Sequence, residues 1–148
     1  MPKISVEEIR NISKTALIQH GALDWISKHV ADAVAASESV GNRICGLYYL
    51  ESYCEQLLSG RVSGQASPDV QLVSSGSVYV DADDGFAQPA FSKGLPEALK
   101  LAKKNGIASL SIGRAHTCTS LGYFTKKIAE AGFLGLGLTN ASPIVAPP

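Results

Sequence analysis

The sequence has no surplus of charge of either sign, and it lacks any long apolar run. Its 13 lysines and arginines are balanced by 13 aspartates and glutamates among 148 residues, which disfavours binding to nucleic acid or to an anionic membrane surface. No segment approaches the roughly 20 apolar residues that a transmembrane helix needs, and the first residues lack the apolar core of a signal peptide. We therefore expect a soluble, cytoplasmic protein with no nucleic-acid or membrane partner.

Cysteines and well-known catalytic motifs are scarce as well. The three cysteines, Cys45, Cys54 and Cys118, are odd in number and lack C-x-x-C spacing, so they indicate neither a disulfide framework nor a metal site. The phosphate-loop, nucleophile-elbow and H-E-x-x-H signatures do not occur. Gly135-Leu136-Gly137 lacks the third glycine of a dinucleotide-binding fingerprint. These absences exclude several common enzyme classes.

What is present is enough apolar sequence to form a core, because 45% of the residues are hydrophobic and 18% are charged. Ser5 and Glu8 form a capping-box pattern that predicts the start of a helix. Apolar residues recur at helical spacing over Leu23 to Ser39 and again between Gly41 and Gly60. Three helices in so short a stretch predict a helical subdomain over residues 1–60.

The rest of the chain changes to an alternation of strands and helices. Residues 61–76 begin with a Gly- and Ser-rich stretch and are interpreted as a linker or hinge. We expect strands at Val78 to Asp81, Ile107 to Ile112 and Phe133 to Thr139, and helices at Leu95 to Lys104 and Leu121 to Ala131. This alternation predicts an α/β portion over residues 77–148, with a mixed sheet whose strands are buried on both faces. An apolar last strand needs a cover, which indicates a longer protein or a second chain.

One polar loop is a candidate site. Residues 113–120 leave an expected strand and enter an expected helix, and open α/β sheets bind ligands at the carboxyl ends of their strands. His116 is therefore a candidate general acid or base, since an imidazole titrates near neutral pH. The alternative is that Thr119 or Ser120 caps the helix and that His116 is a solvated loop residue.

A second cluster lies at the start of the third expected helix, where tyrosines follow Arg43 and Cys45. Hydroxyl groups such as that of Tyr49 can orient a substrate carboxylate or carbonyl group. The same tyrosine spacing is typical of a helix that packs its rings inward. The residues by themselves favour packing.

Together, these segments resemble the malate/L-lactate dehydrogenase family of NAD(P)H-dependent oxidoreductases, which is unrelated in fold to the Rossmann-type lactate dehydrogenases. The resemblance covers essentially the whole chain. Its motifs are the V-D-A-D-D-G segment from Val80, the A-x-x-x-A-K helix from Ala98, Gly122-Tyr123-Phe124, and the run from Ala129 to Pro147 that includes L-G-L-G-L-T-N. The resemblance implies an α/β fold and hydride transfer between NAD or NADP and a small 2-oxo acid, 2-hydroxy acid or cyclic imino acid. It also implies a homodimer with a shared active site.

The chain departs from this family at the residues that carry its chemistry. The family's third helix begins with a proton-donating histidine and a carboxylate-binding arginine, and Cys45 and Tyr49 stand at these positions here. The resemblance leaves His116 as the expected catalytic proton donor, with Arg114, Tyr49 and Cys45 expected to contact the substrate, because a guanidinium grips a carboxylate bidentately. The expected cofactor-binding residues are Thr139, Asn140 and Ser142. The alternative is a catalytically degenerate member of the family that acts as a binding or assembly protein.

Overall fold

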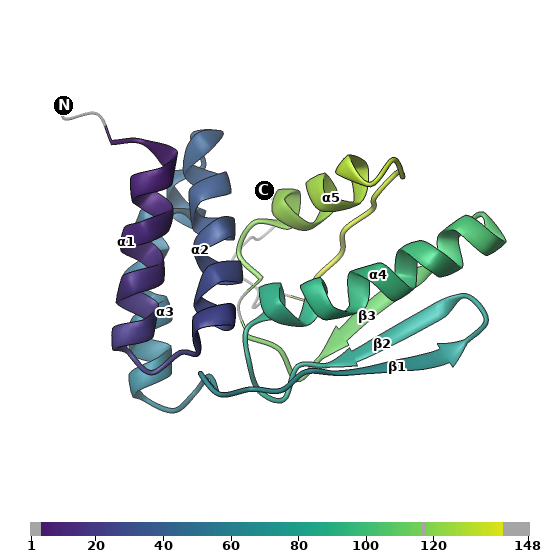
Figure 1. The fold of residues 1–148 in the computed structure, drawn as a ribbon, viewed down its shortest axis with the longest axis horizontal. Helices are drawn as coiled ribbons and strands as arrows, with labels where there is room; N and C mark the ends of the chain where they lie inside the picture. Colours follow the sequence, from purple (N-terminus) through teal and green to yellow (C-terminus); the bar gives the residue numbers. More distant parts are fainter. Residues whose placement is uncertain (1–3, 117, 141–148) are drawn as a thin grey trace, which may run out of the picture.

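The computed structural model describes residues 4–116 and 118–140, and Figure 1 shows their arrangement. A bundle of three helices stands beside a small sheet that is covered by two further helices. In chain order the elements are α1 (Val6–Gln19), α2 (Asp24–Ser39), the 3-10 turn η1 (Arg43–Cys45), α3 (Leu47–Leu58), β1 (Asp69–Ser74), β2 (Ser77–Asp81), α4 (Ala87–Asn105), β3 (Ser109–Gly113) and α5 (Leu121–Glu130). The predicted α/β class, with helices first and a mixed sheet after them, is confirmed.

The helical bundle begins where the capping box predicts. The Ser5 side chain accepts a hydrogen bond from the Glu8 amide (3.1 Å), and the Glu8 carboxylate accepts one from the Ser5 amide (2.8 Å). The two reciprocal bonds satisfy amides that the first turn of a helix otherwise leaves unpaired. Behind this cap the bundle closes on apolar side chains that water barely reaches, among them Leu17, Ile26, Val30, Val34 and Tyr53.

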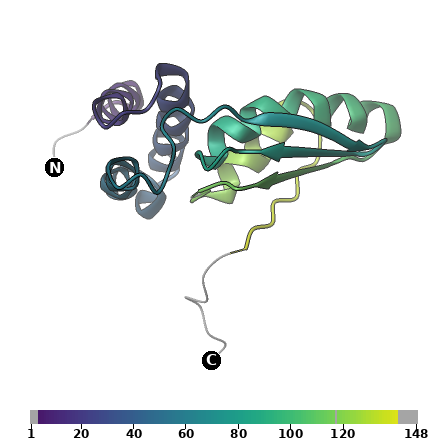
Figure 2. The same cartoon turned by 90° about the horizontal axis from the view of Figure 1, so that it is seen from below.

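Helix α2 is shared between the bundle and the rest of the fold. One of its sides packs in the bundle, while Ala33, on another side, packs with Phe91 of α4 and with Tyr123 and Phe124 of α5. The rings of Phe91 and Phe124 meet edge to face, with 4.9 Å between their centroids. Figure 2, seen from below, shows the bundle on one side of the molecule and the sheet with α4 on the other. The junction between them is therefore a packed interface.

The sheet has the strand order β1-β2-β3, with β1 antiparallel and β3 parallel to β2. Val78 and Val80 of β2 are buried beneath α4, which packs on this face with Ala90 and Ala98. No described helix packs on the opposite face. The expectation that the strands are buried on both faces is therefore wrong for the described residues, because α4 covers only one side.

Strand β1 lies inside the segment that the sequence interpretation treats as a linker over residues 61–76. Residues Asp69–Ser74 pair with β2 in a hairpin, and most of them are exposed. Their polar and apolar residues do not alternate regularly, and an edge strand with little burial leaves no clear periodicity in a sequence. Hydrogen bonding to β2 decides their conformation. Only the part before β1 is a connecting loop.

Helix α4 starts at Ala87, eight residues before the expected start at Leu95. Pro89 is compatible with this start, because a helix tolerates proline in its first turn, whereas Pro96 lies inside the helix. Gly94 lies where the helix comes closest to the sheet. A Cβ atom at Gly94 would lie 2.5 Å from the side chain of Val80 and 2.7 Å from that of Leu110, so the missing side chain permits this close packing.

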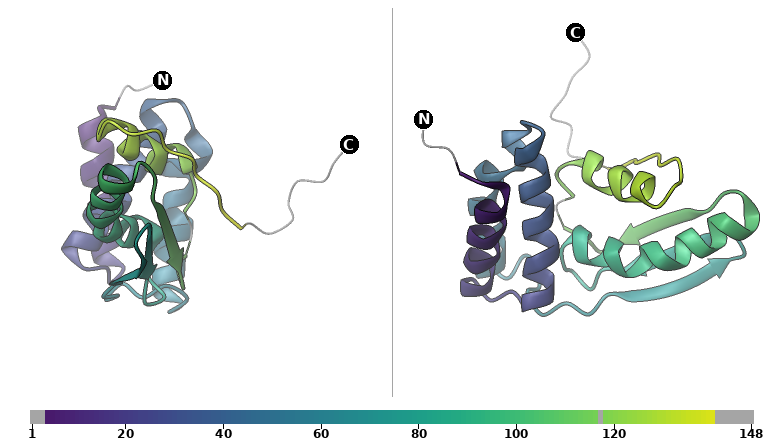
Figure 3. Two further views of the ribbon diagram at one scale, coloured as in Figure 1. Left: turned by 90° about the vertical axis from the view of Figure 1, so that its right-hand side faces the viewer. Right: turned by 45° about the horizontal axis from the view of Figure 1, so that its top comes forward.

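Residues 133–139 do not form the expected strand. They are extended and run back alongside α5, as the right panel of Figure 3 shows. Gly135 and Gly137 face that helix, while Leu134, Leu136 and Leu138 are 103%, 86% and 84% exposed. Successive residues alternate between the helix and solvent, as in a strand, but no described strand lies beside the segment to form backbone hydrogen bonds with it. Within the described residues, no helix has the length and apolarity needed to span a membrane.

Candidate active site at the junction of the bundle and the sheet

Two loops meet at the carboxyl ends of β2 and β3, and both contain strained residues. In the turn after β2, Asp83 and Asp84 have a φ of 54°, and the Asp81 carboxylate accepts a hydrogen bond from the Asp83 amide (2.9 Å). In the loop after β3, Arg114 and Thr119 have φ angles of 46° and 47°. Residues other than glycine rarely adopt this backbone conformation, and those that do are concentrated at functional sites. The strain therefore singles out these two loops.

Arg114 connects the two loops. Its guanidinium donates to Asp81 (2.9 Å) and Asp84 (3.0 Å) and lies 3.5 Å from Asp83. The hydrogen bond from Arg114 lowers the pKa of Asp81 below its ordinary value, and the amide of Asp83 adds to this effect. The sequence predicts that the Arg114 guanidinium binds a substrate carboxylate. In the structure three carboxylates of the chain itself already pair with it.

His116 lies where the loop crosses the start of α4. Its backbone forms a bridge with Phe86: its amide donates to the Gly85 carbonyl (2.9 Å), and its carbonyl accepts from the Ala87 amide (3.1 Å). The side chain is half-buried. His116 thus stands at the carboxyl end of a parallel strand, the position expected for a ligand-binding residue, and its backbone is fixed on both sides.

A buried polar network joins α3 to the same loop. The Tyr53 hydroxyl lies 3.0 Å from the Thr119 hydroxyl and accepts a hydrogen bond from the Gln88 amide group (3.2 Å). Tyr53 and Gln88 are both fully buried. Burial raises the pKa of Tyr53 far above its ordinary value, which keeps the hydroxyl neutral. This contact brings together residues that are 66 positions apart in the chain.

The contact also corrects part of the alternative interpretation of the loop. Ser120 occupies the N-cap position of α5, but its side chain makes no capping hydrogen bond. The Thr119 side chain bonds to Tyr53 instead of to an amide of α5. A capping role was expected because Ser and Thr are frequent N-cap residues. The buried Tyr53 hydroxyl provides a competing partner that no local pattern reveals.

Two of the predicted substrate-contacting residues, Cys45 and Tyr49, lie just before α3 and in its first turn. Cys45 ends η1 and is half-buried, and the next helix starts where Glu38 of α2 accepts a hydrogen bond from the Leu47 amide (2.8 Å). Tyr49 packs edge-on against Tyr53, with 5.1 Å between ring centroids. Inward packing is thus confirmed for Tyr53. Tyr48, by contrast, points into solvent.

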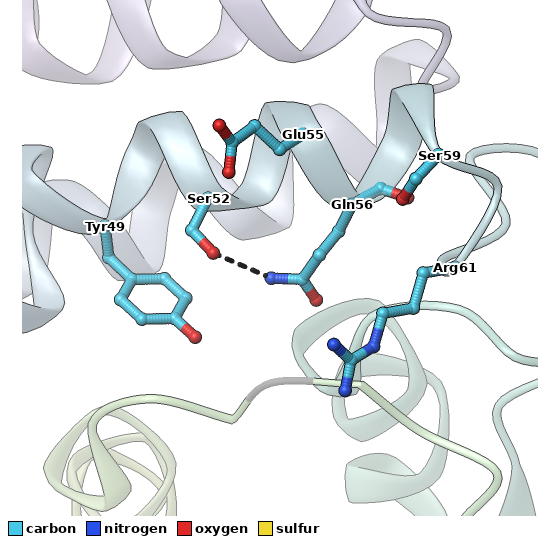
Figure 4. Close-up of a pocket in the computed structure, with 6 residues that line it drawn as sticks. All are labelled: Tyr49, Ser52, Glu55, Gln56, Ser59 and Arg61. Atoms are coloured by element: carbon cyan, nitrogen blue, oxygen red, sulfur yellow. Dashed lines mark hydrogen bonds between the residues drawn. The ribbon is translucent and has the colours of Figure 1, made fainter.

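Beside Tyr49 an open pocket of about 330 Å³ follows one side of α3. Figure 4 shows the six residues that line it, which are Tyr49, Ser52, Glu55, Gln56, Ser59 and Arg61. The sequence interpretation missed Arg61, which falls in a Gly- and Ser-rich stretch read as a linker. The available signal was weak: Arg61 is the only lysine or arginine between positions 59 and 76.

The predicted cofactor-binding residues lie at the end of the extended segment. The Thr139 hydroxyl lies 3.5 Å from the Cys118 thiol, just before α5, and donates to the Asn140 carbonyl (3.3 Å). Thr139 and Asn140 are exposed, whereas Ser142 lies outside the described residues. Hydroxyl and amide groups near a helix start without a side-chain cap fit the polar groups of a dinucleotide. Within residues 4–116 and 118–140, no group of three or more potential ligands is placed to hold a metal ion.

Comparison with known proteins shows the family of this chain. The sequence pattern of the malate/L-lactate dehydrogenase family matches residues 4–148. The chain belongs to this family. Its members are NAD(P)-dependent dehydrogenases and reductases of 2-hydroxy acids and cyclic imino acids.

Individual relatives show which reactions occur within the family. The chain is 30% identical over 145 residues to a Delta(1)-pyrroline-2-carboxylate/Delta(1)-piperideine-2-carboxylate reductase of Pseudomonas putida, covering 98% of this chain and 42% of the relative. It is 29% identical to the ureidoglycolate dehydrogenase (NAD(+)) of Escherichia coli K12, with 98% and 42% covered. It is 31% identical to the (2R)-3-sulfolactate dehydrogenase (NADP(+)) of Chromohalobacter salexigens, with 97% and 43% covered. The chain therefore spans less than half the length of these relatives.

A solved structure supports the fold. The malate dehydrogenase of Pyrococcus horikoshii OT3 superposes with a TM-score of 0.81 over 88% of this chain and 38% of that one, at 22% identity. The helical bundle and the small mixed sheet are thus a known arrangement within this family.

Proposed function

We propose that this chain forms the substrate-binding part of an oxidoreductase that transfers a hydride between NAD or NADP and a small 2-oxo acid, 2-hydroxy acid or cyclic imino acid. Family membership supports the reaction class. The observation that carries the proposal is the hydrogen bond of 3.0 Å between Tyr53 and Thr119. It holds the loop that contains His116 against the helix that contains Tyr49, so that one junction presents a proton donor and a pocket.

In this proposal His116 donates a proton to the substrate oxygen or imine nitrogen. An imidazole suits this task near neutral pH, and the backbone hydrogen bonds to Gly85 and Ala87 fix its position. Bound NADH or NADPH supplies the hydride, and Thr139, Asn140 and Ser142 contact the cofactor. Tyr49 contacts the substrate from α3, and Cys45 contacts it from η1. Arg114 can bind a substrate carboxylate only if its guanidinium first releases its aspartate partners.

We further propose that the protein works in the cytoplasm as a homodimer, because the resemblance implies an active site shared between two subunits. The exposed leucines of the extended segment agree with a surface that other parts of the functional protein cover. A second candidate function is a binding or assembly role without turnover. It is favoured by Cys45, whose thiol is a weak hydrogen-bond donor where the family uses a histidine.

The test measures oxidation of NADH and NADPH with a panel of 2-oxo acids and cyclic imino acids. We expect reduction of at least one substrate, and we expect H116A to lower its rate about 10²- to 10⁴-fold. H20A is the matched control, because His20 ends α1 and its Nδ1 pairs with the Ala16 carbonyl (2.7 Å).

Unchanged turnover in H116A would remove His116 from the mechanism. Cofactor binding without reduction of any substrate would instead favour the non-catalytic role.

A further inference from the structure

The four arginines of this protein differ in what their guanidinium groups contact. Arg10 pairs with Glu7 and Asp32, and Arg114 pairs with three aspartates. In the part of the chain that the structure describes, Arg43 and Arg61 have no carboxylate at ion-pair distance. Arg61 lines the open pocket beside α3, and the other three arginines do not. It is thus an arginine without a charge partner beside an open space.

The wall of that pocket is built to form hydrogen bonds. Tyr49, Ser52, Gln56 and Ser59 recur three or four residues apart, so they share one side of α3 and its end. The Gln56 amide group donates to the Ser52 hydroxyl (3.1 Å). In Figure 4 the Tyr49 hydroxyl, the Gln56 amide and the Arg61 guanidinium all point to the same side of the helix. Neutral polar groups therefore lie beside the guanidinium on this side of the helix.

The two charged groups of the pocket lie apart, which leaves the Arg61 guanidinium open to an anion. Arg61 is its only positive group and Glu55 its only negative one. The Glu55 carboxylate points away from Arg61 in Figure 4, and no ion pair joins the two. A guanidinium binds a planar carboxylate through two parallel hydrogen bonds. The volume of about 330 Å³ lies at the lower end of the range for small-molecule pockets.

We propose that this pocket binds a small monocarboxylate, with its carboxylate on Arg61 and a hydrogen bond from the Tyr49 hydroxyl. The inference rests on the proposed function in one respect, since it names the group that would hold the acid end of the substrate. It assigns that role to Arg61 in place of Arg114, whose guanidinium is already neutralised. The resemblance places an arginine where this chain has Tyr49. In this inference Arg61, in the loop that follows α3, provides the positive charge instead.

The test is binding of pyruvate to the full chain by calorimetry, in the absence of cofactor. Methyl pyruvate is the matched probe, because it keeps the 2-oxo group and lacks the carboxylate charge. We expect pyruvate to bind and methyl pyruvate to bind at least 10-fold more weakly. R61Q should weaken pyruvate binding at least 10-fold, and R61K should lose less because it keeps the charge without the planar fork. E55Q should leave binding unchanged or tighten it.

R43Q is the control variant, because Arg43 is also unpaired among the described residues but does not line the pocket. It should bind pyruvate as the unaltered chain does. Equal binding by R61Q and the unaltered chain, equal affinity for both probes, or no binding of pyruvate would each overturn the inference.

The outcome is separate from that of the proposed function. Loss of binding in R61Q without any turnover of a 2-oxo acid would support the pocket and contradict the reductase. Turnover that does not depend on Arg61 would support the reductase and contradict the pocket.

Discussion

The helical bundle and the α/β portion differ in how their apolar cores are enclosed. In the bundle Leu17, Val30 and Val34 are fully buried by helices that lie within the described residues. In the α/β portion no helix of the described residues covers one face of the sheet, and three leucines of the extended segment face solvent. The bundle therefore encloses a core of its own, whereas the extended segment of the α/β portion leaves a row of leucines open. Single large apolar side chains are exposed in the bundle as well, among them Ile44 (71%) and Leu58 (70%).

This difference also places the candidate site. The strained loops lie at the edge of the less complete region, and the buried Tyr53 network ties one of them to the complete one. A rigid scaffold beneath polar loops is the usual arrangement of binding and catalytic sites. The bundle therefore provides the support for the junction, and the α/β portion provides its loops.

The largest expected effect compares one substitution in both regions. L17A removes a fully buried side chain from the bundle and should lower the free energy of unfolding by about 2–5 kcal/mol. L136A removes a side chain that is 86% exposed and should change that free energy by no more than about 0.5 kcal/mol. Urea denaturation of the two variants measures both values. A cost for L136A equal to that of L17A would show that Leu136 is buried in solution.

A smaller effect is expected at the link between the two regions. Y53F keeps the ring, which packs edge-on against Phe86 at 5.3 Å, and removes the hydroxyl that pairs with Gln88 and Thr119. Buried polar groups that lose a partner cost about 1–3 kcal/mol. We expect this loss in urea denaturation, together with a changed amide chemical shift of Thr119 by NMR.

Y49F is the matched control, because the Tyr49 hydroxyl faces the open pocket (Figure 4). It should change stability by less than about 0.5 kcal/mol. If Y53F behaved like Y49F, the buried network would not hold the loop.

The smallest effect is expected in the solvent-exposed turn. The Arg114 hydrogen bond lowers the pKa of Asp81 from its ordinary value of 3.8. A carboxylate with a lowered pKa in the folded state stabilises the fold fully above its unfolded pKa, and this stabilisation is lost as the pH falls through the folded pKa. R114Q should raise the pKa of Asp81 toward 3.8 and reduce the acid-induced loss of stability below that pH.

Carboxyl NMR titration of Asp81 measures this shift, and R10Q is the control because Arg10 pairs with Glu7 and Asp32 on the bundle instead. An unchanged titration of Asp81 in R114Q would mean that the ion pair does not form in solution.

The sequence predicted those parts of the fold that local chemistry decides. The reciprocal bonds of Ser5 and Glu8 need only four residues, and the prediction of a helix start there is confirmed. The loop with His116 was expected at the end of a parallel strand, and β3 confirms that place. The roles of His116, Arg114, Tyr49 and Cys45 stay predictions, as does the division into residues 1–60, 61–76 and 77–148.

Other features escaped prediction because they depend on a distant partner. β1 is a strand because it pairs with β2, and residues 133–139 are not one because no described strand pairs with them. The sequence predicted that Arg114 binds a substrate carboxylate, but the fold places three aspartates around its guanidinium. Arg61 was unremarkable until α3 placed a row of polar side chains next to it.

By itself, the sequence determined the family, the alternation of helices and strands, and the helix boundaries that side chains a few residues apart can set. Only the tertiary structure decided which arginine is neutralised and which faces a pocket, and that Tyr53 fixes the loop through Thr119. The reason is that charge pairing and burial depend on atoms within a few ångströms, and folding chooses those neighbours from anywhere in the chain.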